Sequence, residues 1–349
     1  MRVKTGLIPR LLSALALAGT LGAPAAARAE NLENSFDSLL GTQQRAATPR
    51  QPVPLPVPLL IPRVPSYATP FEAQLAALAA PHQGRIGVAA LDLASGRNVQ
   101  VLGDQPFPLA STSKIAIVAT FLQGVDDGRW RLSDQYPLMV PVRSAKFSSS
   151  IAPVRPGTIL SAQSLIELAI TRSDNQATDA LLAAVGGPSA VNRWVRQAGI
   201  GGFRLDRDIA TLVRDDGAVN PATTVDPRDS VTPLAMTKLL AGLYRGEWLT
   251  ASSRMVLLGA MERCVTGKGR IRAQLPEGTQ VAHKTGTLSN TASDVGIIRT
   301  PDGRAYAVAI YVTGQGGKAS RDARIATIAR AIYDGYQTES ASLRRSAMR

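Results

Sequence analysis

The chain has 349 residues, of which 45% are hydrophobic and 19% charged, so it holds enough apolar material for one large domain or two smaller ones. Its formal net charge is +13, but the basic residues are scattered and are not interleaved with aromatic side chains, which argues against a nucleic-acid-binding protein. The single cysteine, Cys264, excludes an intramolecular disulfide, and two histidines with one cysteine are too few for a multi-histidine zinc site. We therefore expect a globular protein that needs no metal or other cofactor.

Residues 1–29 have the pattern of a secretory signal peptide. Basic residues near the start precede an apolar run from Leu11 to Ala27, and an Ala-Arg-Ala sequence ends at Ala29. We expect cleavage before Glu30, export to the periplasm or the medium, and no membrane span afterwards. A membrane anchor is the alternative, but glycines and a proline interrupt this short run.

The two ends of the remaining chain differ from its middle. Residues 30–70 contain eight prolines between Thr48 and Pro70, which favours an extended polyproline II linker. Residues 338–349 are predicted to be a disordered basic tail. Residues 71–337 should form one catalytic domain, and this single-domain plan favours a monomer.

The pattern of this domain predicts an α/β (α+β) fold with an antiparallel sheet flanked by helices and an inserted all-helical subdomain. Residues 71–107 and 247–337 should form the α/β part, and residues 108–246 the helical part. Expected strands are Arg85 to Asp92, Asn98 to Leu102, Gln280 to Thr287, Asp294 to Thr300 and Ala305 to Thr313. Expected helices are Phe71 to Ala80, Ile115 to Gln123, Ala162 to Thr171, Ala177 to Val185, Ser189 to Ala198, Pro233 to Leu243 and one through Ile325 to Tyr333.

Ser111 and Lys114 form an S-x-x-K motif at the expected start of a helix. This spacing places both side chains on one helix face, and the helix N-terminus favours developing negative charge. A desolvated lysine near a second cation has a lowered pKa and can take the proton of a serine. The motif therefore predicts that Ser111 is a nucleophile and Lys114 its base, and the alternative for Ser111 is an ordinary helix cap.

Ser173, Asp174 and Asn175 form a polar S-D-N loop after an apolar helix. Ser173 is predicted to pass a proton to a leaving nitrogen, and Asn175 to hold an amide of the substrate. Asp174 should brace the loop. The alternative is a helix-capping turn without a catalytic role.

Lys284, Thr285, Gly286 and Thr287 lie on an expected strand, where Lys284 and Gly286 share one face. The hydroxyl groups of Thr285 and Thr287 are predicted to bind a substrate carboxylate, with Lys284 adding positive charge. The backbone N–H groups of Thr287 and Ser111 are candidates for an oxyanion hole.

Arg270 is a further candidate for this site, whereas the two histidines are not. Arg270 can supply a second positive charge for the carboxylate, and the alternative is a solvated surface arginine. His283 precedes Lys284 on the strand, so the two side chains should point to opposite faces. His82 lies in a turn, and a Ser-His-Asp triad is therefore not expected.

The three motifs, in this order, resemble those of class A β-lactamases in the serine penicillin-recognising superfamily. The resemblance spans about residues 71–336 and implies an α/β part and a helical subdomain with the site between them. It also implies acylation of Ser111 by a cyclic amide, so the expected partner is a small β-lactam or a peptidoglycan-derived substrate. Supporting segments are Arg85 to Arg97, Phe107 to Lys114, Gly186 to Pro188, Arg204 to Arg207 and Asp229 to Pro233.

One loop departs from the family pattern. The resemblance makes Arg207 and Asp229 the buried ion pair that closes this loop. The family carries a water-activating glutamate and a supporting asparagine between them, and an ungapped match places Ile209 and Val213 at these positions. The loop also holds four carboxylates that are candidates either for a replacement base or for solvation: Asp208, Asp215, Asp216 and Asp226.

Three functions follow from these observations. The first is a serine hydrolase of the β-lactamase type whose deacylation is slow, unless Lys114 serves both halves of the reaction. The second is a penicillin-binding protein or a peptidoglycan D-Ala-D-Ala peptidase that acylates and releases slowly. The third is a non-catalytic module that binds the cell wall.

Overall fold

The computed structural model describes residues 57–58 and 69–347. The expected signal peptide and most of the expected linker lie outside the described residues. Within the described part, strand β1 (Val57–Pro58) pairs with β8 (Thr224–Val225). No helix in these ranges is both long enough and apolar enough to cross a membrane.

A five-stranded antiparallel sheet forms one half of the domain, in the order β10-β11-β12-β2-β3. Its strands are β2 (Gly84–Asp92), β3 (Asn98–Val101), β10 (Gln280–Leu288), β11 (Thr291–Arg299) and β12 (Ala305–Gly314). The first and last thirds of the domain therefore meet in one sheet, as predicted. The predicted strands are confirmed, although β11 begins three residues earlier than expected because Asn290, with a φ of 52°, allows a tight turn after β10.

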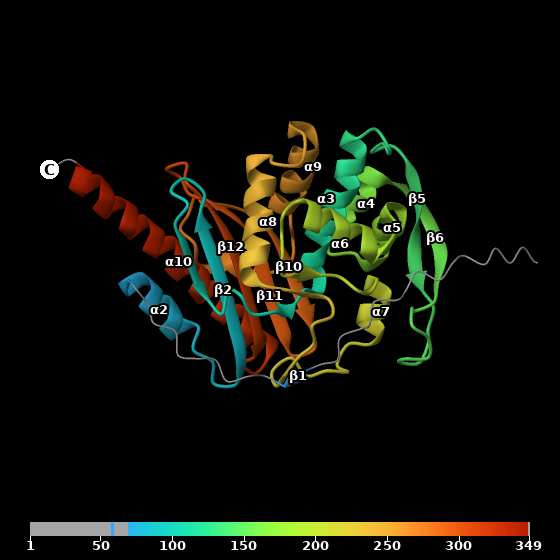
Figure 1. Cartoon of the computed structure of the whole chain (residues 1–349), viewed down its shortest axis with the longest axis horizontal. Coiled ribbons are helices and arrows are strands. Elements are labelled where there is room, and N and C mark those ends of the chain that lie inside the picture. Colours follow the sequence, from blue (N-terminus) through green and yellow to red (C-terminus); the bar gives the residue numbers. More distant parts are fainter. Residues whose placement is uncertain (1–56, 59–68, 348–349) are drawn as a thin grey trace, which may run out of the picture. The chain divides into compact units, whose positions relative to one another are not determined.

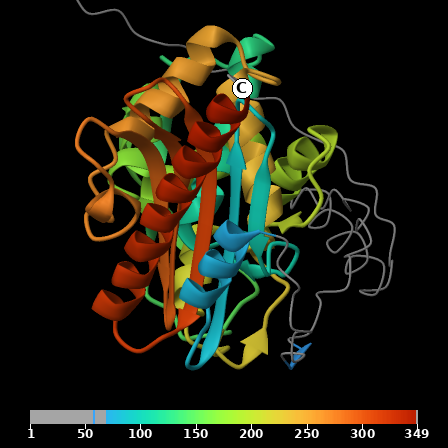
Figure 2. The same ribbon diagram turned by 90° about the vertical axis from the view of Figure 1, so that its left-hand side faces the viewer.

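Both faces of the sheet are buried, so strand β12 has no polar side. Successive side chains point to opposite faces. Ala307, Ala309 and Tyr311 join a core with the helical part, whereas Val308 and Ile310 join a second core. Helices α2 (Pro70–Leu78) and α10 (Lys318–Ala347) cover this second face, and Figure 2 shows both lying against the sheet. The other face packs against α8 (Pro233–Arg245).

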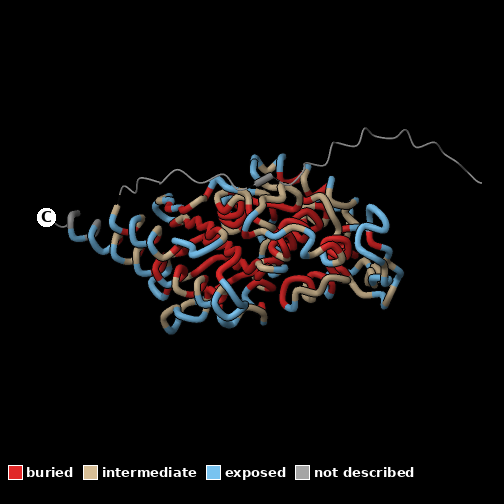
Figure 3. The backbone as a smooth tube through the Cα atoms, turned by 90° about the horizontal axis from the view of Figure 1, so that it is seen from below, coloured by how far each residue is buried: buried red, intermediate tan, exposed pale blue. Residues whose placement is uncertain are grey.

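The inserted half is built around helix α3 (Ser113–Asp126), which is buried along nearly its whole length. Such a helix belongs in the middle of a bundle. Figure 1 shows the surrounding helices beside the sheet, and in Figure 3 the buried segments run through both halves. These helices are α4 (Ala162–Thr171), α5 (Asn175–Val185), α6 (Pro188–Gln197), α7 (Ile209–Arg214) and α9 (Ala251–Glu262). A hairpin of β5 (Gln135–Pro141) and β6 (Val154–Ser161) lies at the outer edge, and a small sheet joins β4 (Phe107–Pro108), β9 (Ser230–Val231) and β7 (Phe203–Arg204).

The C-terminal segment differs from the prediction. Helix α10 continues to Ala347, so residues 338–347 are helical where a disordered tail was expected. Contacts with the domain explain the extension: Glu339 forms an ion pair with Arg97, and the Tyr336 hydroxyl donates to the carbonyl of Ala90. The predicted α/β fold with an inserted helical subdomain is confirmed. Its expected bounds differ at two helices, since α8, expected in the helical part, packs on the sheet, and α9, expected in the α/β part, also packs against α3 and α4.

Candidate active site

A strained turn presents Ser111 at the start of α3. The short helix η1 (Ala110–Thr112) runs directly into α3, and Ala110 adopts a φ of 45°, which is uncommon outside glycine. Two side-chain hydrogen bonds hold the turn: Thr112 donates to Leu109 and Ser113 donates to Ala110. Ser111 remains half-buried, whereas the neighbouring hydroxyl groups of this turn are buried.

The turn fits against strand β10 because residue 286 is a glycine. A Cβ atom there would lie 2.4 Å from Ser293 Oγ, 3.1 Å from Ala110 Cβ and 3.2 Å from the Leu109 carbonyl oxygen. Any larger side chain would push β10 away from the turn that carries Ser111. Gly286 therefore sets the close approach of the first and third motifs.

The side chain of Lys114 reaches the S-D-N loop. Its Nζ lies 2.7 Å from the Ser173 carbonyl oxygen, 2.7 Å from Asn175 Oδ1 and 3.3 Å from Ser173 Oγ. Ser173 has a φ of 59°, and Asp174 caps α5 by accepting from the N–H of Ala177 at 2.8 Å. The cap fixes the loop in the conformation that turns Ser173 and Asn175 toward Lys114.

Lys284 approaches the same hydroxyl from the sheet. Its Nζ donates to Ser173 Oγ at 2.9 Å, so this oxygen contacts both lysines. Burial, reinforced by the charge of Lys284, holds the pKa of Lys114 well below its usual value. Burial lowers the pKa of Lys284 to about 8, although Cys264 and Asp294 act to raise it. The structure thus brings residues of all three motifs into a single hydrogen-bonded group: Lys114, Ser173, Asn175 and Lys284.

Arg270 is buried behind β10, so it is not a solvated surface arginine. Its side chain is 2% exposed, and Nε lies 2.7 Å from Asp322 Oδ1. The other guanidinium nitrogens donate to the carbonyls of Gly286 and Ser293 and to Thr287 Oγ1. Arg270 therefore braces the end of β10 and reaches the expected carboxylate site through the hydroxyl of Thr287, which is exposed.

The two histidines lie apart from this group. His283 is fully buried, and its Nδ1 lies 2.8 Å from Asp294 Oδ1 on the neighbouring strand. His82 is exposed. Neither side chain hydrogen-bonds to Ser111, Lys114 or Ser173.

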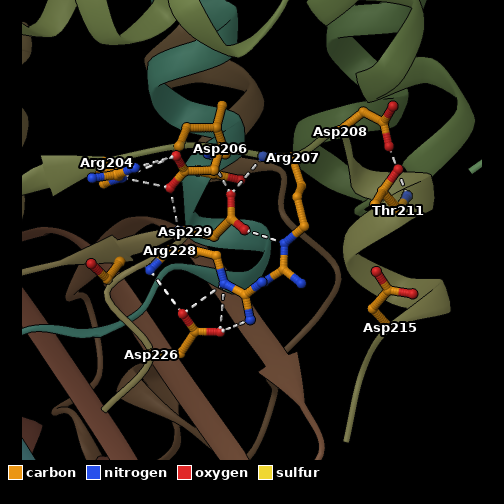
Figure 4. Close-up of polar contacts among 12 residues, drawn as sticks. Arg204, Asp206, Arg207, Asp208, Thr211, Asp215, Asp226, Arg228 and Asp229 are labelled. Atoms are coloured by element: carbon orange, nitrogen blue, oxygen red, sulfur yellow. Dashed lines mark hydrogen bonds and ion pairs between the residues drawn. The ribbon is translucent and has the colours of Figure 1, made fainter. Parts of the chain in front are cut away.

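The loop of residues 207–229 is closed by an ion pair at its base. Arg207 Nε lies 2.5 Å from Asp229 Oδ2, and Asp229 Oδ1 accepts from the backbone N–H groups of Asp206 and Arg207. Burial raises the pKa of Asp229 against the opposing effect of Arg207. Figure 4 shows this base with two further ion pairs beside it, Arg204 with Asp206 and Arg228 with Asp226.

Each of the four candidate carboxylates of the loop already has a partner. Asp208 caps α7 by accepting from the N–H of Thr211 at 2.7 Å, and Asp215 pairs with Arg214 at 2.8 Å. Asp216 accepts from the N–H of Ser289, and Asp226 pairs with Arg228. These contacts are structural, and in Figure 4 Asp208 and Asp215 lie along α7, apart from the ion pairs at the base.

The two positions matched to the family's deacylation pair are apolar and differ in exposure. Ile209 is 2% exposed and belongs to the core of the helical part. Val213 is 50% exposed. Neither side chain can accept a hydrogen bond from a water molecule.

Asp179 is an ionisable residue near this site that could not be singled out from the motifs. It lies in α5 and is 5% exposed, and its two oxygens accept from the N–H groups of Ile209 at 2.7 Å and Ala210 at 2.8 Å. Burial raises its pKa to about 7, against the effect of these hydrogen bonds and of Lys114. The available signal was an aspartate within the largely apolar segment from Ala177 to Val185. A buried carboxyl group is costly unless hydrogen bonds or a charged neighbour stabilise it.

Asp179→Asn is expected to change the pH dependence of stability. Between pH 4 and 7 the native carboxyl keeps a proton that the unfolded chain releases, so the wild-type free energy of unfolding should fall as pH rises. Asparagine does not titrate, so the variant should lack roughly 1–3 kcal/mol of this fall. Urea unfolding at pH 4.5 and 7.5 measures the difference, and parallel pH profiles for the two proteins would contradict the assignment.

Comparisons with known proteins match this architecture over most of the chain. The model of the family described as "Beta-lactamase enzyme family" matches residues 70–336. A curated relative, β-lactamase CTX-M-8 of Citrobacter amalonaticus, is 34% identical over 80% of this chain and 94% of its own length. An imipenem-hydrolyzing β-lactamase of Enterobacter cloacae is 31% identical over 69% of this chain and 81% of its own.

Solved structures show the same likeness. The ancestral class A β-lactamase of Gram-negative bacteria is 36% identical, with a TM-score of 0.65 over 76% of this chain and 99% of its own. A β-lactamase from Chitinophaga pinensis is 26% identical, with a TM-score of 0.67 over 77% of this chain and 100% of its own. Sequence, fold and the ordered placement of the three motifs agree, and the chain belongs to the β-lactamase enzyme family, within its class A serine branch.

Proposed function

We propose that this protein is a serine hydrolase that opens β-lactam rings through an acyl-Ser111 intermediate. The observation that carries the proposal is the position of Ser173 Oγ, which contacts Lys114 Nζ at 3.3 Å and Lys284 Nζ at 2.9 Å. This arrangement offers a proton path from Lys114, one helical turn after Ser111, to a leaving nitrogen. The names of the relatives, which are β-lactamases, support the same substrate class.

In the acylation step, Ser111 Oγ attacks the lactam carbonyl carbon while Lys114 removes the hydroxyl proton. Lys114 suits this role because its lowered pKa leaves a fraction of the amine neutral. The backbone N–H groups of Ser111 and Thr287 would stabilise the oxyanion. The carbon–nitrogen bond then breaks as the proton passes through Ser173 to the ring nitrogen.

The remaining residues hold the substrate. Asn175 would bind an amide of the substrate side chain. Lys284 and the hydroxyls of Thr285 and Thr287 would bind its carboxylate, and Arg270 would support Thr287 from behind. Asp174 would fix the S-D-N loop by capping α5.

Hydrolysis of the acyl-enzyme is the slow step in this proposal. Ile209 and Val213 cannot activate a water molecule, and the four loop carboxylates have structural partners. General-base assistance contributes about 10²- to 10⁴-fold, so deacylation should be slower by a comparable factor unless Lys114 assists it. Arg207 and Asp229 would keep the loop closed over the site.

The engaged loop carboxylates also favour a second function, a penicillin-binding protein or peptidoglycan peptidase that acylates and releases slowly. The same residues would then bind a D-Ala-D-Ala peptide. A third function, cell-wall binding without catalysis, would use the site without Ser111. The N-terminal sequence supports export to the periplasm or the medium by a cleaved signal peptide, and we propose a monomer there.

Intact mass followed over time tests this function. With excess penicillin or cephalosporin, the protein should gain the mass of the intact antibiotic and return to its original mass only slowly. Rapid return would contradict slow deacylation but would leave β-lactam hydrolysis standing. Lasting mass gain, together with release of D-alanine from a D-Ala-D-Ala peptide, would favour the peptidase. No mass gain with either antibiotic would contradict β-lactam recognition itself.

A further inference from the structure

A line of polar side chains runs from the only cysteine to the substrate-binding strand. Cys264 Sγ lies 3.2 Å from Thr266 Oγ1, which lies 2.7 Å from Thr285 Oγ1. Cys264 is 3% exposed and Thr285 is 6% exposed. The turn at Gly267 packs closely against strand β10, because a Cβ atom on Gly267 would lie 2.3 Å from the Cγ2 atom of Thr285.

A buried histidine acts on the thiol and pairs with an aspartate on the neighbouring strand. Asp294 accepts from His283 Nδ1, and although burial lowers the pKa of His283, Asp294 and Cys264 raise it to about 9. Burial alone would raise the pKa of the Cys264 thiol, but His283 foremost, with help from Thr266 and Lys284, lowers it to about 7. The thiol therefore changes charge near neutral pH while its histidine neighbour stays positive.

The charge of the sulfur decides which way the two threonine hydroxyls point. A thiolate only accepts, so Thr266 must donate to it, and Thr266 Oγ1 then accepts the proton of Thr285. When the sulfur is protonated, Thr266 is free to donate to Thr285 Oγ1, which leaves the Thr285 proton for the substrate. An anionic group on the substrate needs that proton, because two oxygens without a hydrogen between them repel.

We propose that Cys264 is a positioning residue that sets, through Thr266, whether the Thr285 hydroxyl donates to a carboxylate of the substrate. The thiol form favours substrate binding and the thiolate form opposes it. This inference rests on the proposed function, in which Thr285 contacts that carboxylate.

Three other sets of charged groups lie on the elements around Cys264. Lys284, on β10, carries charge near the thiol, and burial lowers its pKa to about 8. Arg270 is paired with Asp322 on α10. On the side of α4, Glu167 pairs with Arg263 at an exposed position. The step attributed to Cys264 therefore lies below the titration of Lys284.

Single-turnover acylation by a carboxylate-bearing cephalosporin, measured from pH 5.5 to 8.5, tests the proposal. The half-saturation concentration of the wild type should rise about tenfold through pH 7, since one hydrogen bond to a charged group is lost. Cys264→Ala and Thr266→Val should both remove this rise in the half-saturation concentration. The first variant lacks the sulfur, and the second lacks the hydroxyl that links the sulfur to Thr285. Thr266→Val should keep the alkaline rise near pH 8 that belongs to Lys284. In Cys264→Ala this rise should move to lower pH, because the charge of Cys264 raises the pKa of Lys284.

Thr279→Val is the matched control. It also removes a buried threonine hydroxyl near β10, but one without a hydrogen-bond partner among the described residues, so the wild-type profile should remain. A half-saturation concentration that does not change through pH 7 in the wild type, or a step that persists in Cys264→Ala, would overturn the proposal. Absence of acylation at every pH in the wild type would instead count against the proposed function.

Discussion

Ser111→Ala is expected to abolish covalent modification by β-lactams. Loss of the nucleophile in a serine acyl-transfer enzyme lowers the rate on the order of 10⁶-fold, because no other group is placed to attack the carbonyl. Ser111 is half-buried at the head of α3, and its hydroxyl is not needed by the hydrogen bonds that hold the turn. The variant should therefore fold, and intact mass with a penicillin should stay unchanged for hours.

Ser113→Ala serves as the control for this loss. Ser113 lies two residues away and donates to the Ala110 carbonyl at 2.8 Å, but it is fully buried and cannot meet a substrate. This variant should lose about 1 kcal/mol of stability and keep its acylation, because the bond from Thr112 to Leu109 still holds the turn. Continued mass gain in Ser111→Ala would show that another group is the nucleophile. Cell-wall binding that persists in Ser111→Ala without any modification in the wild type would favour the non-catalytic module.

The sheet could be predicted well because its strands are apolar on both faces and bounded by turn residues. The hairpin of β5 and β6 was missed, since Pro137 and Pro141 interrupt the first of its strands and prolines argue against a strand. Helix α9 was also missed, because Ser252 and Ser253 follow its cap at Thr250, and serines are poor helix formers. Neither element carries a motif, so both depend on packing that only the folded chain supplies.

The residues of the site could be predicted by type and order but not by contact. The spacing of Ser111 and Lys114 indicated one helix face, yet nothing local indicates that Ser173 Oγ lies between two lysines from different halves of the chain. Arg270 shows the same limit, since its burial arises from α10 and two strands that are distant in sequence. Long-range contacts of this kind depend on the register of β10 against the turn at Ala110, which Gly286 permits.

Lys114→Met is expected to lower the acylation rate by about 10²- to 10⁴-fold, the usual contribution of a general base. Methionine fills a similar volume and removes only the amine that reaches Ser173 and Asn175. Stopped-flow acylation with a chromogenic cephalosporin measures the loss, and thermal unfolding checks the fold. Lys238→Met, at an exposed position on α8, is the matched control and should acylate at the wild-type rate.

The pH dependence separates a base from a mere cation at position 114. Because the pKa of Lys114 is lowered, the wild-type acylation rate should rise with pH as the neutral amine forms, and then fall above about pH 8 as Lys284 loses its charge. Lys114→Arg keeps the positive charge but cannot accept a proton, so it should be as slow as Lys114→Met at every pH. An arginine variant with near wild-type acylation would show that position 114 acts by its charge, and the base would then have to be sought elsewhere, first at Asp179, which interacts electrostatically with Lys114.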